Sequence, residues 1–134
     1  IMVSANVSDE IASDYKEALI RSMFNQDEIN LYKTNFYIGE NNKGYLSYIA
    51  FEISTPKNQF GEERINYIKE IMEKENTDRR TIAEYLILSD PKLTMANIKE
   101  VETALYRRNI QRLINNTYYQ LPDDTWTVYT NTNS

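Results

Sequence analysis

The sequence predicts an α+β fold, in which an N-terminal helix and a β-hairpin precede a three-helix segment with C-terminal strands. Two observations support this prediction. Only three glycines and three prolines occur in 134 residues, so the regular elements between these breaks should be long. The apolar residues also change spacing along the chain, from the helical interval of three or four residues to the strand interval of two. We therefore expect an α-β-β lobe over residues 1–61 and a helical segment with a C-terminal strand over residues 62–134.

The first expected element is a helix over residues 9–24. Ser8 can cap its N-terminus, and the acidic residues Asp9 and Glu10 suit the positive end of the helix dipole. Apolar residues then recur at helical spacing, which predicts one stripe facing the core. These residues are Ile11, Tyr15, Ala18, Leu19 and Met23.

A β-hairpin is expected next. Aromatic and β-branched residues alternate between residues 29 and 38, which predicts a strand. They are Tyr32, Thr34, Phe36 and Ile38. The segment 39–44 begins and ends with glycine and should reverse the chain. Residues 45–53 are apolar on both faces, as in a strand that is covered from both sides.

Three helices are expected after the hairpin. The apolar spacing predicts the first over residues 62–75, and Asn76 can end it. Thr77 should cap the second helix, which is expected to stop near Asp90 because the residue before Pro91 is biased away from helical geometry.

The third helix should begin at Thr94 and end near Arg108. Its apolar stripe loses phase beyond Leu105, and Asn109 is a residue type that can adopt the left-handed conformation in which helices end. Residues 110–114 then alternate as a strand.

Two turns divide the C-terminal strands. Asn115 and Asn116 form a two-residue turn that tolerates positive φ, and residues 117–121 should return as the second strand of a hairpin. Residues 122–124 are typical of another turn, and residues 125–129 are expected to form the last strand.

Three stretches of the second half carry a family resemblance, namely TIAEYL, SDPKLTMANIKEVETALYRRN and IQRLINNTYYQL. Through them, residues 62–121 resemble the winged helix-turn-helix superfamily. In that superfamily a recognition helix ends in a left-handed residue, commonly glycine, before an apolar strand and a wing. Asn109 stands at the glycine position, between Leu105 and Ile110 at the flanking apolar positions. The resemblance implies a winged-helix fold, duplex DNA binding and a role in transcription regulation.

The same resemblance implies a DNA-contacting surface. Side chains of the recognition helix would enter the major groove, and arginines would contact the flanking phosphates. The residues in these roles are Asn97, Lys99 and Thr103 for the groove, Arg79, Arg80, Arg107 and Arg108 for the phosphates, and Asn115 and Asn116 for the wing. The alternative for each arginine is an ion pair with a nearby glutamate on a solvated face.

The composition excludes most common catalytic machinery. The chain has no cysteine and no histidine, and therefore no thiolate zinc site, no cysteine nucleophile and no imidazole base. Because the remaining carboxylates, hydroxyls and lysines form no recognisable catalytic constellation, we expect a protein that is not an enzyme and has no metal or cofactor.

The charge distribution limits the kinds of partner. The net charge is −5, which argues against coating of nucleic acid by bulk positive charge. Residues 62–112 hold ten basic and ten acidic residues, so the segment that resembles a DNA-binding domain is the least acidic part. No run of 18 apolar residues occurs, and we expect a cytoplasmic protein that does not interact with membranes.

Two functions follow as hypotheses. The first is a small regulator that binds duplex DNA through residues 62–121 and uses the N-terminal lobe to form a homodimer or bind a protein partner. The lobe cannot bury both faces of its strands alone, and seven of the eleven tyrosines fall in predicted strands. The alternative is a protein interaction module, such as a phage or mobile-element inhibitor of a host factor, that does not bind DNA.

Overall fold

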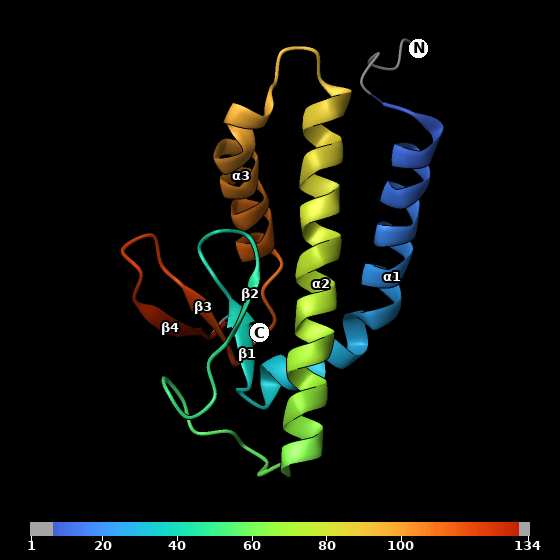
Figure 1. Cartoon of the computed structure of the whole chain (residues 1–134). Helices are drawn as coiled ribbons and strands as arrows, with labels where there is room; N and C mark the ends of the chain where they lie inside the picture. Colours follow the sequence, from blue (N-terminus) through green and yellow to red (C-terminus); the bar gives the residue numbers. More distant parts are fainter. Residues whose placement is uncertain (1–6, 132–134) are drawn as a thin grey trace.

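The computed structural model describes residues 7–131 and has the mixed α+β architecture that the sequence predicts (Figure 1). An N-terminal helix and a hairpin precede the other helices and the C-terminal strands. The elements are α1 (Asp9–Thr34), β1 (Ile38–Glu40), β2 (Leu46–Tyr48), α2 (Glu62–Ser89), the short 3₁₀ helix η1 (Met95–Asn97), α3 (Ile98–Gln111), β3 (Thr117–Gln120) and β4 (Trp126–Tyr129).

The longest helix, α2, stands between the other two α-helices. Figure 1 shows α1 on one side of α2 and α3 on the other. α1 bends, and its C-terminal part passes behind α2 towards β1 (Figure 1). The main hydrophobic core lies where this part of α1 meets α2 and the first hairpin. Ile29 and Tyr32 of α1 pack there with Ile68 and Met72 of α2 and with Ile38 of β1.

Four short strands form one sheet in the order β2-β1-β3-β4. β1 pairs with β2, and β3 with β4, in the antiparallel sense, so each of these pairs is a hairpin. The two central strands are parallel, with Glu40 opposite Tyr119. Parallel neighbours need a crossover connection, and α2 and α3 supply it. Strands from both sides of Gly61 therefore belong to one sheet.

α1 continues past the predicted end at Phe24, and the strand predicted over residues 29–34 is wrong because this segment is helical. Ile29, Tyr32 and Lys33 are buried at helical intervals on one face. The alternation of aromatic and β-branched residues in the same segment concealed this spacing. No glycine or proline interrupts the chain before Gly39, so nothing in the backbone stops the helix earlier.

α1 ends in a Schellman motif. The Phe36 N–H donates to the Lys33 carbonyl at 3.0 Å, and the Tyr37 N–H donates to the Tyr32 carbonyl at 3.0 Å. Phe36 has a φ of 67°, the left-handed conformation that glycine more often takes at this position. Of the predicted first strand, only Ile38 lies in β1, which continues through Gly39 and Glu40 into the segment predicted to reverse the chain.

α2 is one helix, so the predicted break at Asn76 and the predicted cap at Thr77 are both wrong. The Asn76 side chain makes a tertiary contact instead. Its amide donates to the Leu46 carbonyl at 3.0 Å, and its oxygen accepts from the Leu46 N–H at 2.8 Å. Asn76 therefore holds β2 against α2 while its own backbone stays helical. The helix ends at Ser89, two residues before Pro91, as predicted.

Thr94 caps the third helical segment, as predicted, through a capping box with Asn97. The predicted end near Arg108 is wrong, since α3 continues to Gln111 and Asn109 is helical. The strand predicted over residues 110–114 is also wrong. The Asn109 side chain donates to groups near β1, so its amide serves a tertiary contact while its backbone stays helical. The elements behind the winged-helix resemblance are thus arranged differently, and the resemblance stays a hypothesis.

The remaining strand predictions are confirmed with shorter bounds. β2 covers Leu46–Tyr48 rather than residues 45–53, because the chain turns at Phe51, whose φ is 69°. Asn116 takes the positive φ expected of the turn before β3, at 63°. The turn at residues 122–124 joins β3 to β4, so the C-terminal hairpin pairs these two strands.

Candidate functional site

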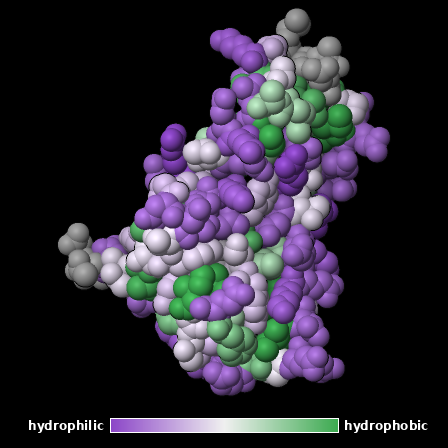
Figure 2. All heavy atoms as spheres, turned by 60° about the vertical axis from the view of Figure 1, so that its left-hand side comes forward, coloured by the Kyte–Doolittle hydropathy of each residue, from purple (hydrophilic) through white to green (hydrophobic). Residues whose placement is uncertain are grey.

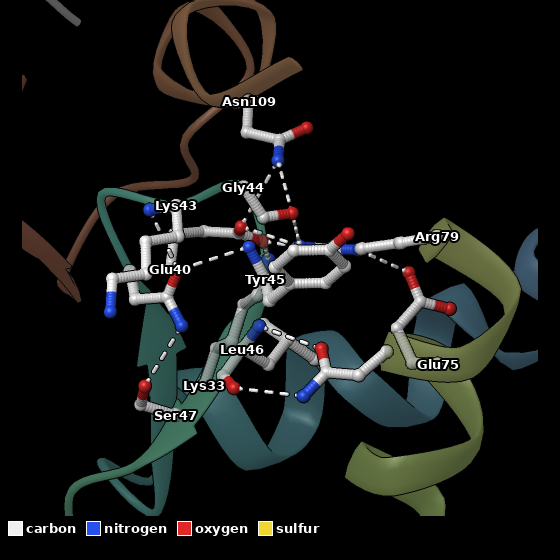
Figure 3. Close-up of polar contacts among 12 residues, drawn as sticks. Lys33, Glu40, Lys43, Gly44, Tyr45, Leu46, Ser47, Glu75, Arg79 and Asn109 are labelled. Atoms are coloured by element: carbon white, nitrogen blue, oxygen red, sulfur yellow. Dashed lines mark hydrogen bonds and ion pairs between the residues drawn. The ribbon is translucent and has the colours of Figure 1, made fainter. Parts of the chain in front are cut away.

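Four ionic side chains form a buried cluster where α1, β1 and α2 meet (Figure 3). The Glu40 carboxylate lies at its centre. Lys33 Nζ lies 2.6 Å from one Glu40 oxygen, and Arg79 contacts both oxygens at 2.8 and 2.9 Å. Arg79 Nε also donates to Glu75 Oε2 at 2.8 Å. The charges therefore alternate in sign from Lys33 through Glu40 and Arg79 to Glu75.

Three regular elements supply the four members of this cluster. Lys33 lies in the last turn of α1, and Glu40 is the last residue of β1. Glu75 and Arg79 lie one turn apart on α2 and so project from the same face. From α3, the Asn109 side chain donates to Glu40 at 3.3 Å (Figure 3). The cluster thereby joins all three α-helices to the sheet.

The cluster keeps Glu40 ionised. Burial alone would raise the pKa of this carboxyl, but the charges and hydrogen bonds of Arg79 and Lys33 outweigh burial and lower it to about 2. Burial would likewise lower the pKa of Arg79, and Glu40 and Glu75 raise it instead. Near neutral pH both groups are therefore charged and fully engaged with one another.

Glu75 is the least satisfied member of the cluster. Its Oε2 accepts from Arg79 and, at 3.3 Å, from Ser22 Oγ. Its Oε1 is buried and has no hydrogen-bond partner among the described residues. A buried carboxylate oxygen without a donor is costly, so this position retains capacity for one further hydrogen bond.

A cavity of about 560 Å³ lies beside the cluster, between α1 and α3, and we call it the α1–α3 groove. Its lining includes four cations and two carboxylates, a local net charge of +2 in a chain whose total is −5. The charged residues are Lys33, Arg79, Arg108, Arg112, Glu40 and Glu75. The apolar residues are Leu19, Met23, Ile82, Leu105 and Ile114.

Two of the cations on the groove are free to bind. Arg108 and Arg112 lie one turn apart near the end of α3 and are exposed. Neither forms an ion pair with any residue from 7 to 131. Lys33 and Arg79, by contrast, are neutralised by Glu40 and Glu75.

Exposed apolar side chains lie on α1 next to this groove. Ile20, Met23 and Phe24 are 66%, 77% and 86% exposed, and Met23 also lines the groove. The face turned forward in Figure 2 carries its hydrophobic residues in separate areas among hydrophilic ones. A cluster of three large and strongly exposed apolar residues is typical of an interaction surface.

No family model, curated protein or solved structure matches this chain significantly. Within residues 7–131 no group of three or more acidic side chains could hold a metal ion. In the same part of the chain, no helix is long and apolar enough to cross a membrane.

The structure separates the residues that the sequence suggested for DNA contacts. Arg79 lies inside the buried cluster, where a phosphate could not reach it without breaking its ion pairs with Glu40 and Glu75. Arg80 contacts Glu84 at 3.7 Å and Glu102 at 3.5 Å. Both arginines pair with glutamates, but only Arg80 does so on an exposed face, as in the alternative interpretation of the sequence.

The other residues that the sequence suggested for DNA contacts lie in η1, in α3 and in the turn before β3. Asn97 is used locally, since its oxygen accepts from the Thr94 N–H at 2.9 Å. The Thr103 hydroxyl donates to the Lys99 carbonyl. The basic side chains Lys99, Arg107 and Arg108 are exposed and form no ion pair in the described part of the chain. Asn115 and Asn116 lie in the turn before β3, where Asn115 accepts from the Asn131 N–H.

Three residues of the cluster were not anticipated from the sequence. The sequence predicts a strand at Lys33, and this prediction conceals the helical position from which Lys33 reaches Glu40. It predicts that Glu40 lies in the segment that reverses the chain, where a carboxylate needs no partner. Only the four-residue interval between Glu75 and Arg79 was a visible signal, because such pairs meet on a helix.

Proposed function

We propose that the chain is a non-enzymatic interaction module that binds an acidic segment of a protein partner in the α1–α3 groove. The observation that carries this proposal is the unpaired state of Arg108 and Arg112 on a groove that also has apolar walls. Arginine binds carboxylates with two parallel hydrogen bonds and loses less hydration than lysine on pairing. The two unpaired arginines on the groove therefore favour a ligand that carries carboxylates.

The apolar lining indicates what else the partner should carry. Leu19, Met23 and Leu105 face the groove from two helices. A ligand with carboxylates alone would leave these side chains in contact with water. A segment that alternates acidic and apolar side chains, such as an amphipathic acidic helix, would meet both the arginines and the apolar walls.

The non-enzymatic part of the proposal rests on the buried cluster. A general base must take up a proton near the working pH, and the pKa of Glu40 is about 2. Both Glu40 oxygens are also occupied by Lys33 and Arg79. This geometry favours a role for the cluster in holding the groove together.

The test is a titration with a capped helical peptide that repeats glutamate and leucine, followed by NMR of methyl groups. We expect shifts at Ile82, Leu105 and Ile114, which line the groove. Arg108→Ser and Arg112→Ser should each weaken binding at least about fivefold, since hydrogen bonds between charged groups are stronger than neutral ones.

Arg107→Ser is the matched control. Arg107 is exposed on the same helix, one residue before Arg108, but does not line the groove. Its replacement should leave peptide affinity unchanged. Absence of shifts at the groove methyls with millimolar peptide, or an equal loss in the Arg107 variant, would refute the proposal.

Duplex DNA binding is the second candidate, and one observation favours it. Lys99, Arg107 and Arg108 are exposed along α3 without ion pairs and could meet phosphates. In a mobility shift with random duplex DNA at low salt, Lys99→Ser and Arg107→Ser should then weaken binding, although the same Arg107 variant is neutral for the peptide. A failure to shift any duplex at low salt would exclude this candidate.

A further inference from the structure

One face of α1 carries the three most exposed large apolar side chains of residues 7–131, namely Ile20, Met23 and Phe24. They lie three and four residues apart and therefore share one side of the helix. Removal of such apolar side chains from water is favourable. A cluster of three large apolar side chains with this exposure is typical of an interaction surface.

Two unpaired charges lie at the two ends of this apolar face along the helix. Lys16 lies one turn before Ile20, and Asp27 lies just under one turn after Phe24. At about 100° per residue, all of these side chains fall on the same side of α1. Both charged residues are exposed, and neither forms an ion pair with another described residue. The face thus has a basic end, an apolar middle and an acidic end.

We propose that this face binds the same face of a second copy of the chain, with the two α1 helices antiparallel. In that arrangement Ile20 of each copy lies against Met23 and Phe24 of the other. Lys16 and Asp27 are nearly equally far from the middle of the patch, so Lys16 of each copy lies opposite Asp27 of the other. A two-fold axis relates the copies, as in most homodimers.

The order of charges selects this arrangement over a parallel one. A parallel pair would place Asp27 against Asp27 and Lys16 against Lys16, which is unfavourable for like charges. An antiparallel pair replaces both repulsions with two ion pairs. This self-complementary pattern is what an interface between identical copies requires, whereas an unrelated partner would not need it.

The proposed contact is small, so we expect the affinity between the two copies to be low. Stable interfaces bury roughly 1,200–2,000 Å² in total, and a single pair of helix faces with three apolar residues each lies at or below this range. We therefore expect a reversible dimer, populated between roughly 10 µM and 1 mM. This inference goes beyond the proposed function, because the patch lies on the outer face of α1 and shares only Met23 with the α1–α3 groove.

Sedimentation equilibrium of the full chain tests the apolar part of the contact. The unaltered chain should show a mass that rises with concentration towards that of a dimer. Phe24→Asn should weaken self-association at least about tenfold. Phe51→Asn is the matched control, since Phe51 is also an exposed phenylalanine and lies in a loop far from α1 in sequence, with a positive φ that asparagine tolerates. It should leave the dimer unchanged.

A charge exchange tests the register. Lys16→Asp and Asp27→Lys should each weaken the dimer about fivefold or more, because each creates two like-charge contacts. The double variant should regain the original affinity, since its charges are exchanged but still complementary. Circular dichroism checks that the helix content is unchanged. A chain that stays monomeric up to about 1 mM, or a double variant as weak as the single ones, would overturn the proposal. Binding of the peptide at Arg108 is measured in a separate experiment. Failure of the proposed dimer therefore does not decide the proposed function, and the reverse also holds.

Discussion

At the scale of single residues, Glu40 shows how one carboxylate can organise a small fold. It receives hydrogen bonds from Lys33 of α1, Arg79 of α2 and Asn109 of α3. Each of these donors thus links a different helix to β1. Removal of one partner from such a buried pair usually costs about 3–5 kcal/mol, because an unpaired charge remains. The helices are therefore held in position by electrostatics as well as by apolar packing.

The lowered pKa of Glu40 predicts how stability depends on pH. A carboxyl whose pKa falls from its ordinary 4.5 to about 2 on folding stabilises the fold above pH 4.5. This contribution, roughly 3 kcal/mol by linkage, is lost as the pH falls towards 2. NMR of the Glu40 carboxyl carbon should show no titration near pH 4.5. A Glu40 midpoint above pH 4 would contradict the prediction.

At the scale of elements, the sequence predicted the first hairpin, the last two strands and most turns. It wrongly paired residues 117–121 with a strand at residues 110–114, and it misplaced helix ends. The two errors at Asn76 and Asn109 have one physical cause. Asn76 and Asn109 are residue types that end helices, but in this chain their amides bind Leu46 and the Glu40 cluster. A sequence pattern shows the intrinsic preference of a residue and does not show which distant group its side chain will meet. For the same reason the Glu40 cluster was not foreseen.

The substitution Asn76→Ala separates the intrinsic helix preference of this position from the tertiary hydrogen bonds of its side chain. Alanine has the higher helix propensity, so the substitution should stabilise α2 if only local preference matters. We expect the opposite, a loss of about 1–3 kcal/mol, because the Leu46 N–H and carbonyl would both lose their partners. Asn66 of the same helix is exposed and serves as the control. Asn66→Ala should raise the free energy of unfolding slightly in urea denaturation, and a stabilised Asn76 variant would refute the argument.

At the scale of the whole molecule, the central pair of strands unites the two halves of the chain. β1 and β3 approach so closely at Gly39 that an added Cβ would lie 2.8 Å from the Tyr118 carbonyl oxygen and 3.0 Å from the Trp126 ring. Glycine is required here by lack of space rather than by backbone conformation. The boundary that the sequence predicts at Gly61 lies in the connector between β2 and α2. The sheet contains strands from both sides of this boundary.

Gly39→Ala should therefore weaken the sheet at its centre. We expect a loss of about 1–3 kcal/mol, the usual cost of overpacking against backbone atoms that cannot move aside. Gly61→Ala is the control, because a Cβ at Gly61 meets nothing within 4 Å and its φ of −72° suits any residue. Thermal unfolding should show a lower midpoint for the Gly39 variant and little change for the other. Equal midpoints would contradict the role given to Gly39.

The parallel pairing of Glu40 with Tyr119 also has a consequence for the order of folding. Most of the chain lies between these two residues, so their contact closes a long loop and has a high entropic cost. The packing of α1 against α2 involves shorter separations, such as the 57 residues between Arg21 and Asp78, and should form first. The central strands would then join after the transition state for folding, so substitutions at Gly39 should speed unfolding more than they slow folding.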